Sequence, residues 1–520
     1  MATGKALDGK PYAGNPHVRF DEGEVAPAAT PRRGSLLYKM KRRAFLKLAA
    51  GTAALPLFSI GAAANGPGGA RKIRLGLIGC GGRMGLSTGY GILNSMCGPD
   101  EEIVCLAEPD PSHWDKVRAV VKAHQPQTDT SKIRAYYDYR EMLEKEAKNL
   151  DAVAIATPNH HHAPAALRAM AKGLHVYVEK PMALTVEEVR LMHAMQKRTG
   201  IVAQVGNHGH SEEGMRRLVE YIRAGTIGQV REVWSFDDRL NAMLYRPPKA
   251  EPPKGMDWDS WCGPAPVCDY YAPTQDHNGL HPHDWHDWIG YGNGSIGNMG
   301  THIIDPVFWA LDLGKVVPES VETKRAEWGC AGSWTWATEI EWKYPARTGM
   351  DPVTLRWFDG VKPGVPYDKD HVDKIGVCRQ RAYQNLPPVV EELEKKYGQS
   401  LGCLGSIFVG EKGIIRIGPH GDGLVFGPKD LYKKRPLKLF PREKGMDHPT
   451  DWLRAIRNPG RPCGCNFDYS APLATTVLLG NAAPRAGVKK LLWDGRRFTN
   501  DDAANQYLRA TYRPGWELMG

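Results

Sequence analysis

The sequence lacks the features that define several classes of protein. Its ten cysteines have no regular spacing, so no disulfide scaffold is predicted, although export would leave an oxidised pair open. It contains no low-complexity tract and no short-period repeat. A large basic surplus is also missing, because six of the ten net positive charges lie in residues 1–64. The charge that remains is too small and too interspersed to predict nucleic-acid binding.

The length and composition are those of a soluble globular protein with more than one core. At 520 residues the chain is too long for one ordinary domain, so two domains are expected. Hydrophobic residues make up 42% and charged residues 24%. Most of the 15 tryptophans follow residue 230, which indicates an aromatic-rich second domain.

Residues 1–64 have the pattern of a targeting segment. Paired arginines, Arg42 and Arg43, precede an apolar stretch, 48–64, that ends in three alanines. This pattern resembles a twin-arginine export signal, with Met40 as the expected true start and the periplasm, or another exported location, as the destination. The stretch is short and broken by Gly and Pro. Cleavage is therefore favoured over an uncleaved anchor, and no stable membrane insertion is expected.

A glycine cluster follows the first predicted strand, KIRLGLIG. Gly79 and Gly81 would let the backbone turn tightly against a pyrophosphate, and a helix pattern follows them. The next strand, EIVCLAE, ends at Glu108, which can accept hydrogen bonds from a ribose diol and would repel a 2′-phosphate. NAD is therefore predicted in preference to NADP. The alternative is a flavodoxin-like sheet without a bound dinucleotide.

Strands and helices continue to alternate as far as residue 206. Asp138 with Glu141, and Thr185 with Glu188, are capping signals at the start of two of the helices. Parallel strands linked by helices predict a doubly wound sheet over residues 71–206, with ligands beyond the carboxyl ends of the strands.

Two later strand ends converge on the same crevice. One is followed by the run ATPNHHH and the next by Glu179-Lys180-Pro181, so Lys180 is predicted to point toward a nicotinamide ring. No metal site is predicted from the three histidines, because neighbouring side chains diverge. The residues expected to bind the cofactor are Gly79, Gly81, Gly82, Arg83, Met84, Glu108, Thr157, Pro158, Asn159, His162, Glu179 and Lys180.

The glycine cluster, ATPNHHHAPAAL, EKPMALTVEE and GNMGTHIIDPVFWAL together resemble the glucose–fructose oxidoreductase and inositol dehydrogenase family, Gfo/Idh/MocA. Pieces such as LRWFDG and ATYRPGW are similar to its exported bacterial branch. The resemblance implies a Rossmann domain followed, over residues 207–520, by an α/β domain with a large open, mostly antiparallel sheet. That sheet commonly mediates dimers or tetramers in the family, so a homo-oligomer is expected.

The resemblance also implies a catalytic set, the lysine of E-K-P with an aspartate and a histidine spaced D-x-x-x-H. These positions are Lys180, Asn298 and His302 in this chain. A histidine can take a hydroxyl proton near neutral pH, and a lysine beside it can stabilise the alkoxide. Asn298 departs from the family pattern because an amide cannot ionise.

The stretch 269–294 is dense in aromatic and histidine residues, as carbohydrate pockets often are. The alternative is a packed, tryptophan-rich loop. The residues predicted to face the substrate are Tyr271, His283, Trp285, His286 and Trp288.

Three functions remain open from the sequence. The first is an exported NAD(P)-dependent oxidoreductase that acts on a secondary hydroxyl of a sugar, sugar derivative or cyclitol with tightly bound NAD. The second is a redox-neutral NAD-dependent glycosidase that oxidises, eliminates and reduces again. The third, suggested by Asn298, is a non-catalytic sugar-binding homologue.

Overall fold

The computed structural model describes residues 71–85, 91–365, 372–373, 376–378, 380–434, 438–440 and 447–518. The predicted export signal at 1–64, with Met40, lies outside these residues. From Lys72 onward the described residues belong to one compact unit. Among them, no helix combines the length and the hydropathy needed to cross a lipid bilayer.

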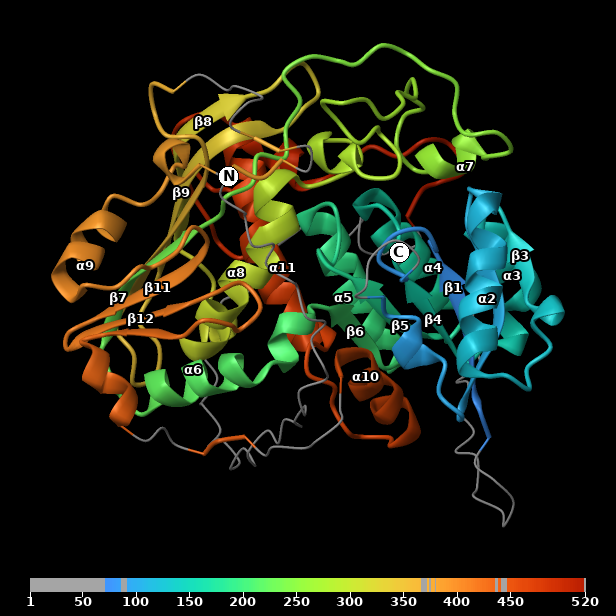
Figure 1. Ribbon diagram of the computed structural model, residues 1–520, viewed down its shortest axis with the longest axis horizontal. Helices are drawn as coiled ribbons and strands as arrows, with labels where there is room; N and C mark the ends of the chain where they lie inside the picture. The colour runs from blue at the N-terminus through green and yellow to red at the C-terminus, as the bar shows by residue number, and fades with distance from the viewer. Residues whose placement is uncertain are drawn as a thin grey trace, which may run out of the picture. The chain divides into compact units, whose positions relative to one another are not determined.

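The first sheet is parallel throughout and has the order β3-β2-β1-β4-β5-β6 (Figure 1). Its strand order reverses between β1 and β4, and ligands bind at such a switch point beyond the carboxyl ends of the strands. The predicted Rossmann domain is confirmed. The strands are β1 (Ile73–Ile78), β2 (Glu101–Ala107), β3 (Arg134–Tyr136), β4 (Ala152–Ile155), β5 (His175–Glu179) and β6 (Ala203–Gly206).

Helices cover this sheet and begin where the sequence signals them. In α5 (Val186–Thr199) the side chains of Thr185 and Glu188 cap each other's backbone N–H groups, and Gly200 ends the helix with φ 67°. Asp138 caps α3 by accepting from the N–H of Arg140. The α-helices in the part described are α2 (Trp114–His124), α3 (Tyr139–Glu146), α4 (His162–Ala171), α5, α6 (Glu213–Arg223), α7 (Trp258–Cys262), α8 (Gly294–Ala310), α9 (Val389–Tyr397), α10 (His448–Arg457) and α11 (Phe467–Arg485).

The helix predicted directly after the glycine cluster is not found among the described residues. Residues 81–85 form turns, and the segment from 91 contains only a 3₁₀ turn, Asn94–Met96, while 86–90 lie outside the described residues. The predicted helix therefore remains a prediction over residues 86–90.

The second sheet has eight strands in the order β13-β12-β11-β7-β10-β9-β8-β14. Its pairs in the part described are antiparallel except for β7 with β10, as predicted for the second domain. Helices α8 and α11 cover one face, and α9 packs on the other face against Phe236 and Phe358. The strands are β7 (Val230–Phe236), β8 (Ser320–Trp328), β9 (Thr335–Tyr344), β10 (Val353–Gly360), β11 (Gly405–Gly410), β12 (Gly413–Ile417), β13 (Val425–Gly427) and β14 (Lys490–Leu492).

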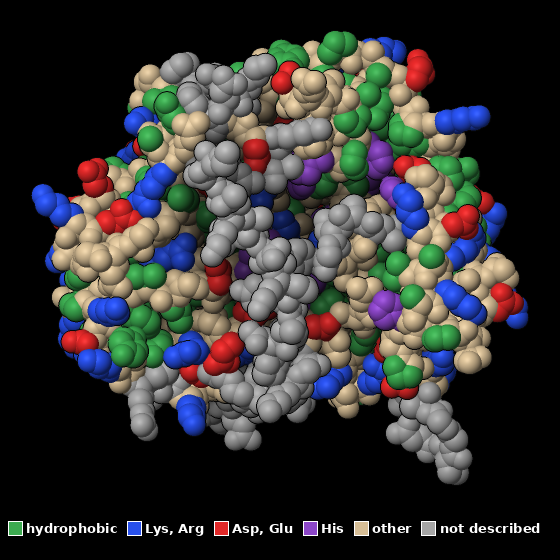
Figure 2. All heavy atoms as spheres, in the orientation of Figure 1, with side chains coloured by type: hydrophobic (Ala, Val, Ile, Leu, Met, Phe, Trp, Pro, Cys, Tyr) green, Lys and Arg blue, Asp and Glu red, His purple; other side chains and the backbone are tan. Residues whose placement is uncertain are grey.

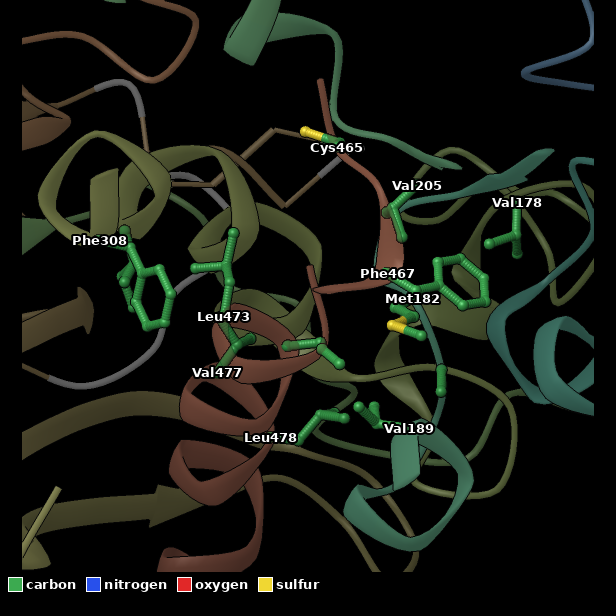
Figure 3. Close-up of a cluster of buried hydrophobic side chains, with 14 of the residues drawn as sticks. Val178, Met182, Val189, Val205, Phe308, Cys465, Phe467, Leu473, Val477 and Leu478 are labelled. Carbon is green, nitrogen blue, oxygen red and sulfur yellow. The ribbon is translucent and has the colours of Figure 1, made fainter. Parts of the chain in front are cut away.

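Helix α11 joins the two sheets through one continuous hydrophobic core. Figure 3 shows Phe467 and Leu478 of α11 near Val178, Val205 and Val189, which belong to β5, β6 and α5. Helix α10 packs on the first sheet as well, through the buried indole of its Trp452. The core therefore continues across the predicted domain boundary at residue 206.

Neither the surface charge nor the cysteines indicate a special function. On the face shown in Figure 2, basic and acidic side chains are interspersed rather than gathered by sign. All ten cysteines are free thiols, and most of them are buried.

Candidate active site

The carboxyl ends of β1, β2, β4 and β5 border an open cleft of about 1020 Å³, which includes the solvent at its mouth. Most of the predicted cofactor residues line it, as do two of the predicted substrate residues, Trp285 and His286. Unpredicted residues, among them His161, Trp261 and His281, complete its walls. The predicted residues on the cleft wall are Gly79, Gly81, Gly82, Arg83, Glu108, Thr157, Pro158, Asn159, Glu179, Lys180, Trp285 and His286.

The glycine turn after β1 packs tightly against the end of β4. Gly79 has φ 77°, and a Cβ there would lie only 2.6 Å from Cγ2 of Thr157 and 2.8 Å from its Cα. A Cβ on Gly81 would lie 2.8 Å from Cε1 of His113. Only glycine fits at the first position, and the bare backbone leaves room for a phosphate to approach.

Glu108 fixes the glycine turn and remains able to bind a ligand. Its two carboxylate oxygens accept from the N–H groups of Cys80 at 2.7 Å and Asp110 at 2.9 Å. Each oxygen keeps a further acceptor site, which suits a ribose diol. A hydrogen bond with His281 holds the pKa of Asp110 well below its usual range, so a second negative charge beside Glu108 would repel a 2′-phosphate.

The cleft has a polar atom that a cofactor would satisfy. The hydroxyl of Thr157 at the end of β4 is buried and makes no hydrogen bond with the described residues. A buried hydroxyl without a partner is costly. Together with the bare glycine turn and the acceptor sites of Glu108, this hydroxyl shows that the residues fit a nicotinamide dinucleotide.

Lys180 reaches from the end of β5 to helix α8 in the second domain. Its Nζ donates to both the backbone O and Oδ1 of Asn298, each at 2.9 Å. Burial lowers the pKa of Lys180 to about 7, although the nearby carboxylate of Glu179 opposes this shift. A large fraction of Lys180 is therefore a neutral amine at neutral pH.

The hydrogen bonds of the neutral amine fix the direction of its lone pair. A neutral amine has two N–H groups, and Asn298 provides one acceptor for each of them. The lone pair then points away from Asn298, and it can accept a proton from a bound hydroxyl. An uncharged acceptor favours the neutral amine, because a carboxylate at the same place would favour the ammonium form.

His302 lies one turn beyond Asn298 on α8, and buried polar side chains hold it in place. Its Nδ1 lies 2.8 Å from Oδ1 of Asn207, whose Nδ2 donates to Asp305 at 2.8 Å. Because the amide must donate to the carboxylate, its oxygen accepts from His302. The Nδ1 of His302 therefore carries the proton, and its Nε2 is a free acceptor.

Burial, followed by the nearby His420 and Lys180, lowers the pKa of His302 well below its usual value. The rings of His302 and His420 meet edge to face, with centroids 4.4 Å apart. Burial likewise lowers the pKa of His420 to about 4. Both imidazoles are therefore neutral near pH 7, and Lys180 is the group that titrates there.

Trp285 and His286 also line the cleft and stack with ring centroids 3.6 Å apart. Nδ1 of His286 is buried without a hydrogen-bond partner among the described residues. Burial lowers its pKa well below the usual value, with His283 and Lys180 acting in the same direction. An aromatic face beside an unused imidazole nitrogen suits a sugar ring with its hydroxyls.

Other predicted residues lie outside this cleft. The indole N–H of Trp288 donates to the hydroxyl of Tyr271 at 2.8 Å. Because each polar group has a hydrogen-bond partner, both side chains can pack in a buried aromatic cluster. His283 is partly exposed and has its Nδ1 3.2 Å from Asp284. The side chain of Met84 is fully buried in the core of the first sheet.

The histidines after β4 are buried and hydrogen-bonded to the backbone. His162 has its two ring nitrogens 2.7 Å from the carbonyl of Pro181 and 3.0 Å from that of Thr157, so it ties together the ends of β4 and β5. His160 lies against the carbonyls of Trp261 and Tyr291. The three histidines of the run are therefore buried rather than in contact with solvent.

The sequence contained signals for the supporting residues that were not predicted. Asn207 directly follows β6, so the same rule that singled out Lys180 applies to it. Asp305 is three residues beyond His302, one helical turn along α8.

Two family descriptions match the chain. Residues 73–207 match "Oxidoreductase family, NAD-binding Rossmann fold" of Gfo/Idh/MocA, and residues 233–349 match "Oxidoreductase family, C-terminal alpha/beta domain". The second match includes helix α8 with Asn298 and His302.

Two relatives share parts of the sequence. The 1-carboxy-3-chloro-3,4-dihydroxycyclohexa-1,5-diene dehydrogenase of Comamonas testosteroni is 41% identical over 112 residues, 21% of this chain and 28% of that protein. A glycosyl hydrolase family 109 protein of Shewanella pealeana is 31% identical over 217 residues, 37% of this chain and 44% of that protein. Each match spans less than half of the relative's own length.

A solved structure shares the fold. The WlbA dehydrogenase of Bordetella pertussis, in complex with NADH and UDP-GlcNAcA, aligns with a TM-score of 0.50 at 17% identity, over 81% of this chain and 99% of that one. A likeness at this identity shows the fold alone. With its NAD-binding Rossmann fold and its C-terminal α/β domain, the chain belongs to the Gfo/Idh/MocA oxidoreductase family.

Proposed function

We propose that the protein is an exported NAD-dependent oxidoreductase that acts on a secondary hydroxyl of a sugar, sugar derivative or cyclitol. The observation that carries the proposal is the pair of 2.9 Å hydrogen bonds from Lys180 to Asn298, beside a cleft that fits NAD. They hold an amine with a pKa of about 7 where two domains meet. A general base is most effective when its pKa lies near the working pH.

A bound nicotinamide dinucleotide supplies the hydride acceptor. Neutral Lys180 takes the hydroxyl proton through the lone pair that Asn298 leaves free. His302, fixed with its proton on Nδ1, offers Nε2 to a hydroxyl and supplies no charge. The sequence alone favoured His302 as the base. We assign proton transfer to Lys180 and orientation to His302, because Lys180 has a pKa of about 7 whereas the pKa of His302 lies well below its usual value.

Carbohydrate-like substrates are supported by the aromatic pair that lines the cleft, Trp285 and His286. The stacked rings of Trp285 and His286 offer an apolar face and an unused nitrogen acceptor or donor. The Comamonas relative is named as a dehydrogenase of a dihydroxylated carbocycle. The stacked rings and the substrate named for this relative both suit a ring that bears neighbouring hydroxyls.

A redox-neutral glycosidase is the second candidate. It is favoured by the 31% identity over 217 residues with a glycosyl hydrolase family 109 protein. The same base and the same hydride acceptor would serve an oxidation, elimination and reduction cycle. Tightly held NAD would suit that cycle in an exported protein, which meets no free cofactor pool.

The activity test uses the NAD-loaded protein with a panel of sugars, cyclitols and nitrophenyl glycosides. Net oxidation is expected to raise the absorbance of reduced nicotinamide. Release of nitrophenol without net reduction would select the glycosidase instead. Lys180→Ala is expected to lower the rate of either reaction by about 10²- to 10⁴-fold.

Bound NAD and the melting temperature of Lys180→Ala should match the parent, because its role lies at the reacting carbon. A variant as active as the parent, with a cofactor that never changes redox state, would select a non-catalytic sugar-binding protein. Loss of fold would mark Lys180 as structural.

Export and assembly need their own measurements. Paired substitution of Arg42 and Arg43 by lysine is expected to retain the protein in the cytoplasm, and N-terminal sequencing of the exported form would locate the cleavage site. A homo-oligomer formed through the second sheet should appear as a dimer or tetramer in light scattering. A monomeric mass would reject that part of the proposal.

A further inference from the structure

A second cavity, of about 1160 Å³ including the solvent at its mouth, lies apart from the cofactor cleft. The end of α11, the N-terminus of α5 and residues 506–512 form much of its wall. The two cavities share no lining residue: His160 faces this one, whereas Asn159 and His161 face the cofactor cleft. The cavity is therefore not a branch of the site at Lys180.

Amide side chains form part of the wall between the two cavities. Asn293 accepts at Oδ1 from Asn159, which lines the cofactor cleft, at 2.8 Å. Its backbone carbonyl accepts from Nδ2 of Asn481, which lines the second cavity, also at 2.8 Å. These hydrogen bonds close the wall between the two cavities. A ligand of the second cavity would therefore be bound by the residues of that cavity alone.

Arg485 is the unusual group of this cavity. It is the last residue of α11, and its guanidinium packs over the ring of Tyr507, 4.6 Å from the centroid. Burial lowers its pKa, and the only group that acts in the opposite direction is the Tyr507 hydroxyl. Among the described residues, Arg485 forms no hydrogen bond and no ion pair. The other arginine of the cavity, Arg509, pairs with Glu187 at 3.3 Å.

Arg485 is partly buried, and its five N–H donors remain available to a ligand that enters the cavity. The negative end of the α11 dipole favours a cation at this position, but it engages none of the guanidinium N–H groups in the part described. The fork of N–H groups on arginine matches a carboxylate in a two-point contact. The cavity supplies one unpaired positive charge, so a monoanion balances it better than a phosphate dianion.

The remaining walls suit an organic body attached to that carboxylate. Trp334 and Ile289 contribute apolar surface, and Gln506 contributes an amide. We propose that this cavity binds a small hydroxylated carboxylate of sugar-acid size, with Arg485 as its anchor. The inference is independent of the reaction at Lys180, because the two cavities share no residue.

The test is calorimetric titration of the full, NAD-loaded protein with D-gluconate. Sorbitol provides the same hydroxylated chain without the carboxylate, and inorganic phosphate provides an anion without the chain. Gluconate is expected to bind, while sorbitol and phosphate should bind at least about tenfold more weakly. Equal binding of sorbitol, or no heat with gluconate, would overturn the proposal.

Variants locate the binding site. Arg485→Gln is expected to weaken gluconate binding at least about tenfold, and Arg485→Lys, which keeps the charge but loses the fork, by a smaller factor. Arg497→Gln, a change at an exposed arginine, serves as the matched control and should bind as the parent does. If gluconate binding is lost in Lys180→Ala instead, the acid occupies the cofactor cleft and the proposal fails. Melting temperatures show whether each variant is folded. If Arg485→Gln does not fold, the weaker gluconate binding expected of Arg485→Lys still tests the proposal.

Discussion

The cofactor side and the reaction side of the cleft are held together in different ways. On the cofactor side, Glu108 and His162 are tied to backbone groups nearby in the sequence or at the next strand end. On the reaction side, Lys180 and His302 are held by side chains about a hundred residues away. The cofactor side is a local property of strand ends, whereas the reaction side exists only after the two domains have packed.

This difference predicts which substitutions act on binding and which act on rate. Changes near Glu108 should affect cofactor affinity and leave the chemistry intact. Changes around Asn298 and Asn207 should affect proton transfer and orientation while NAD still binds. Three substitutions test this division, in order of decreasing expected effect.

Asn207→Leu should have the largest effect, because it removes the group that orients His302 and leaves the buried Asp305 with one donor fewer. We expect kcat to fall by about ten- to a hundredfold and the free energy of unfolding to fall by about 1–3 kcal/mol. Steady-state kinetics and thermal melting would measure the two effects. NAD binding should change little.

Asn385→Leu is the matched control. This buried amide donates to the carbonyls of Thr338 and Asp359 in the second sheet and lines neither cavity. It should lower stability without lowering the kcat of the folded fraction. If Asn207→Leu behaves the same way, His302 needs no orientation by Asn207, and the contrast between the two sides of the cleft is weakened.

Asn298→Asp tests the titration of Lys180. A carboxylate in place of the amide would stabilise the ammonium form and raise the pKa of Lys180 from about 7. Because the neutral amine is the base, the rising limb of kcat/KM against pH should move to higher pH by about one unit or more. A profile that does not move would mean that Lys180 is not the base.

Glu108→Gln should have the smallest effect. The amide cannot accept at both of its ends, so one bond to the N–H of Cys80 or Asp110 is lost, and so is the charge that repels a 2′-phosphate. We expect NAD affinity to fall by about three- to tenfold and the preference for NAD over NADP to narrow. Fluorescence titration with both dinucleotides measures this, and a kcat much below that of the parent would contradict the division.

The sequence predicted the first domain well because its signals are local. Alternating strands, the glycine turn and the capping box at Thr185 and Glu188 depend on neighbours within a few residues, and the structure contains all of them. The helix expected after the glycine turn falls on residues that include 86–90, which lie outside the described residues, so it stays a prediction.

The reaction side was harder to predict because residue types do not reveal distant partners. The spacing of Asn298 and His302 placed both on one helical face, and the family pattern added Lys180. Asn207 follows a strand end and Asp305 lies one helical turn beyond His302, but the sequence did not indicate that Asn207 would bond to both of them. Aromatic density in 269–294 could not separate Trp285, on the cleft wall, from Trp288, in the packed cluster.

The path of α11 has a consequence for biosynthesis. The first sheet is completed late, because Phe467 and other α11 residues cover β5 and β6, and each such buried side chain contributes about 1.5–3 kcal/mol. The nascent Rossmann half would therefore leave the ribosome with an exposed apolar face and stay dependent on chaperones until nearly the whole polypeptide has been made. A ribosome stalled before residue 467 should carry a protease-sensitive first half, however complete its nucleotide-binding sequence.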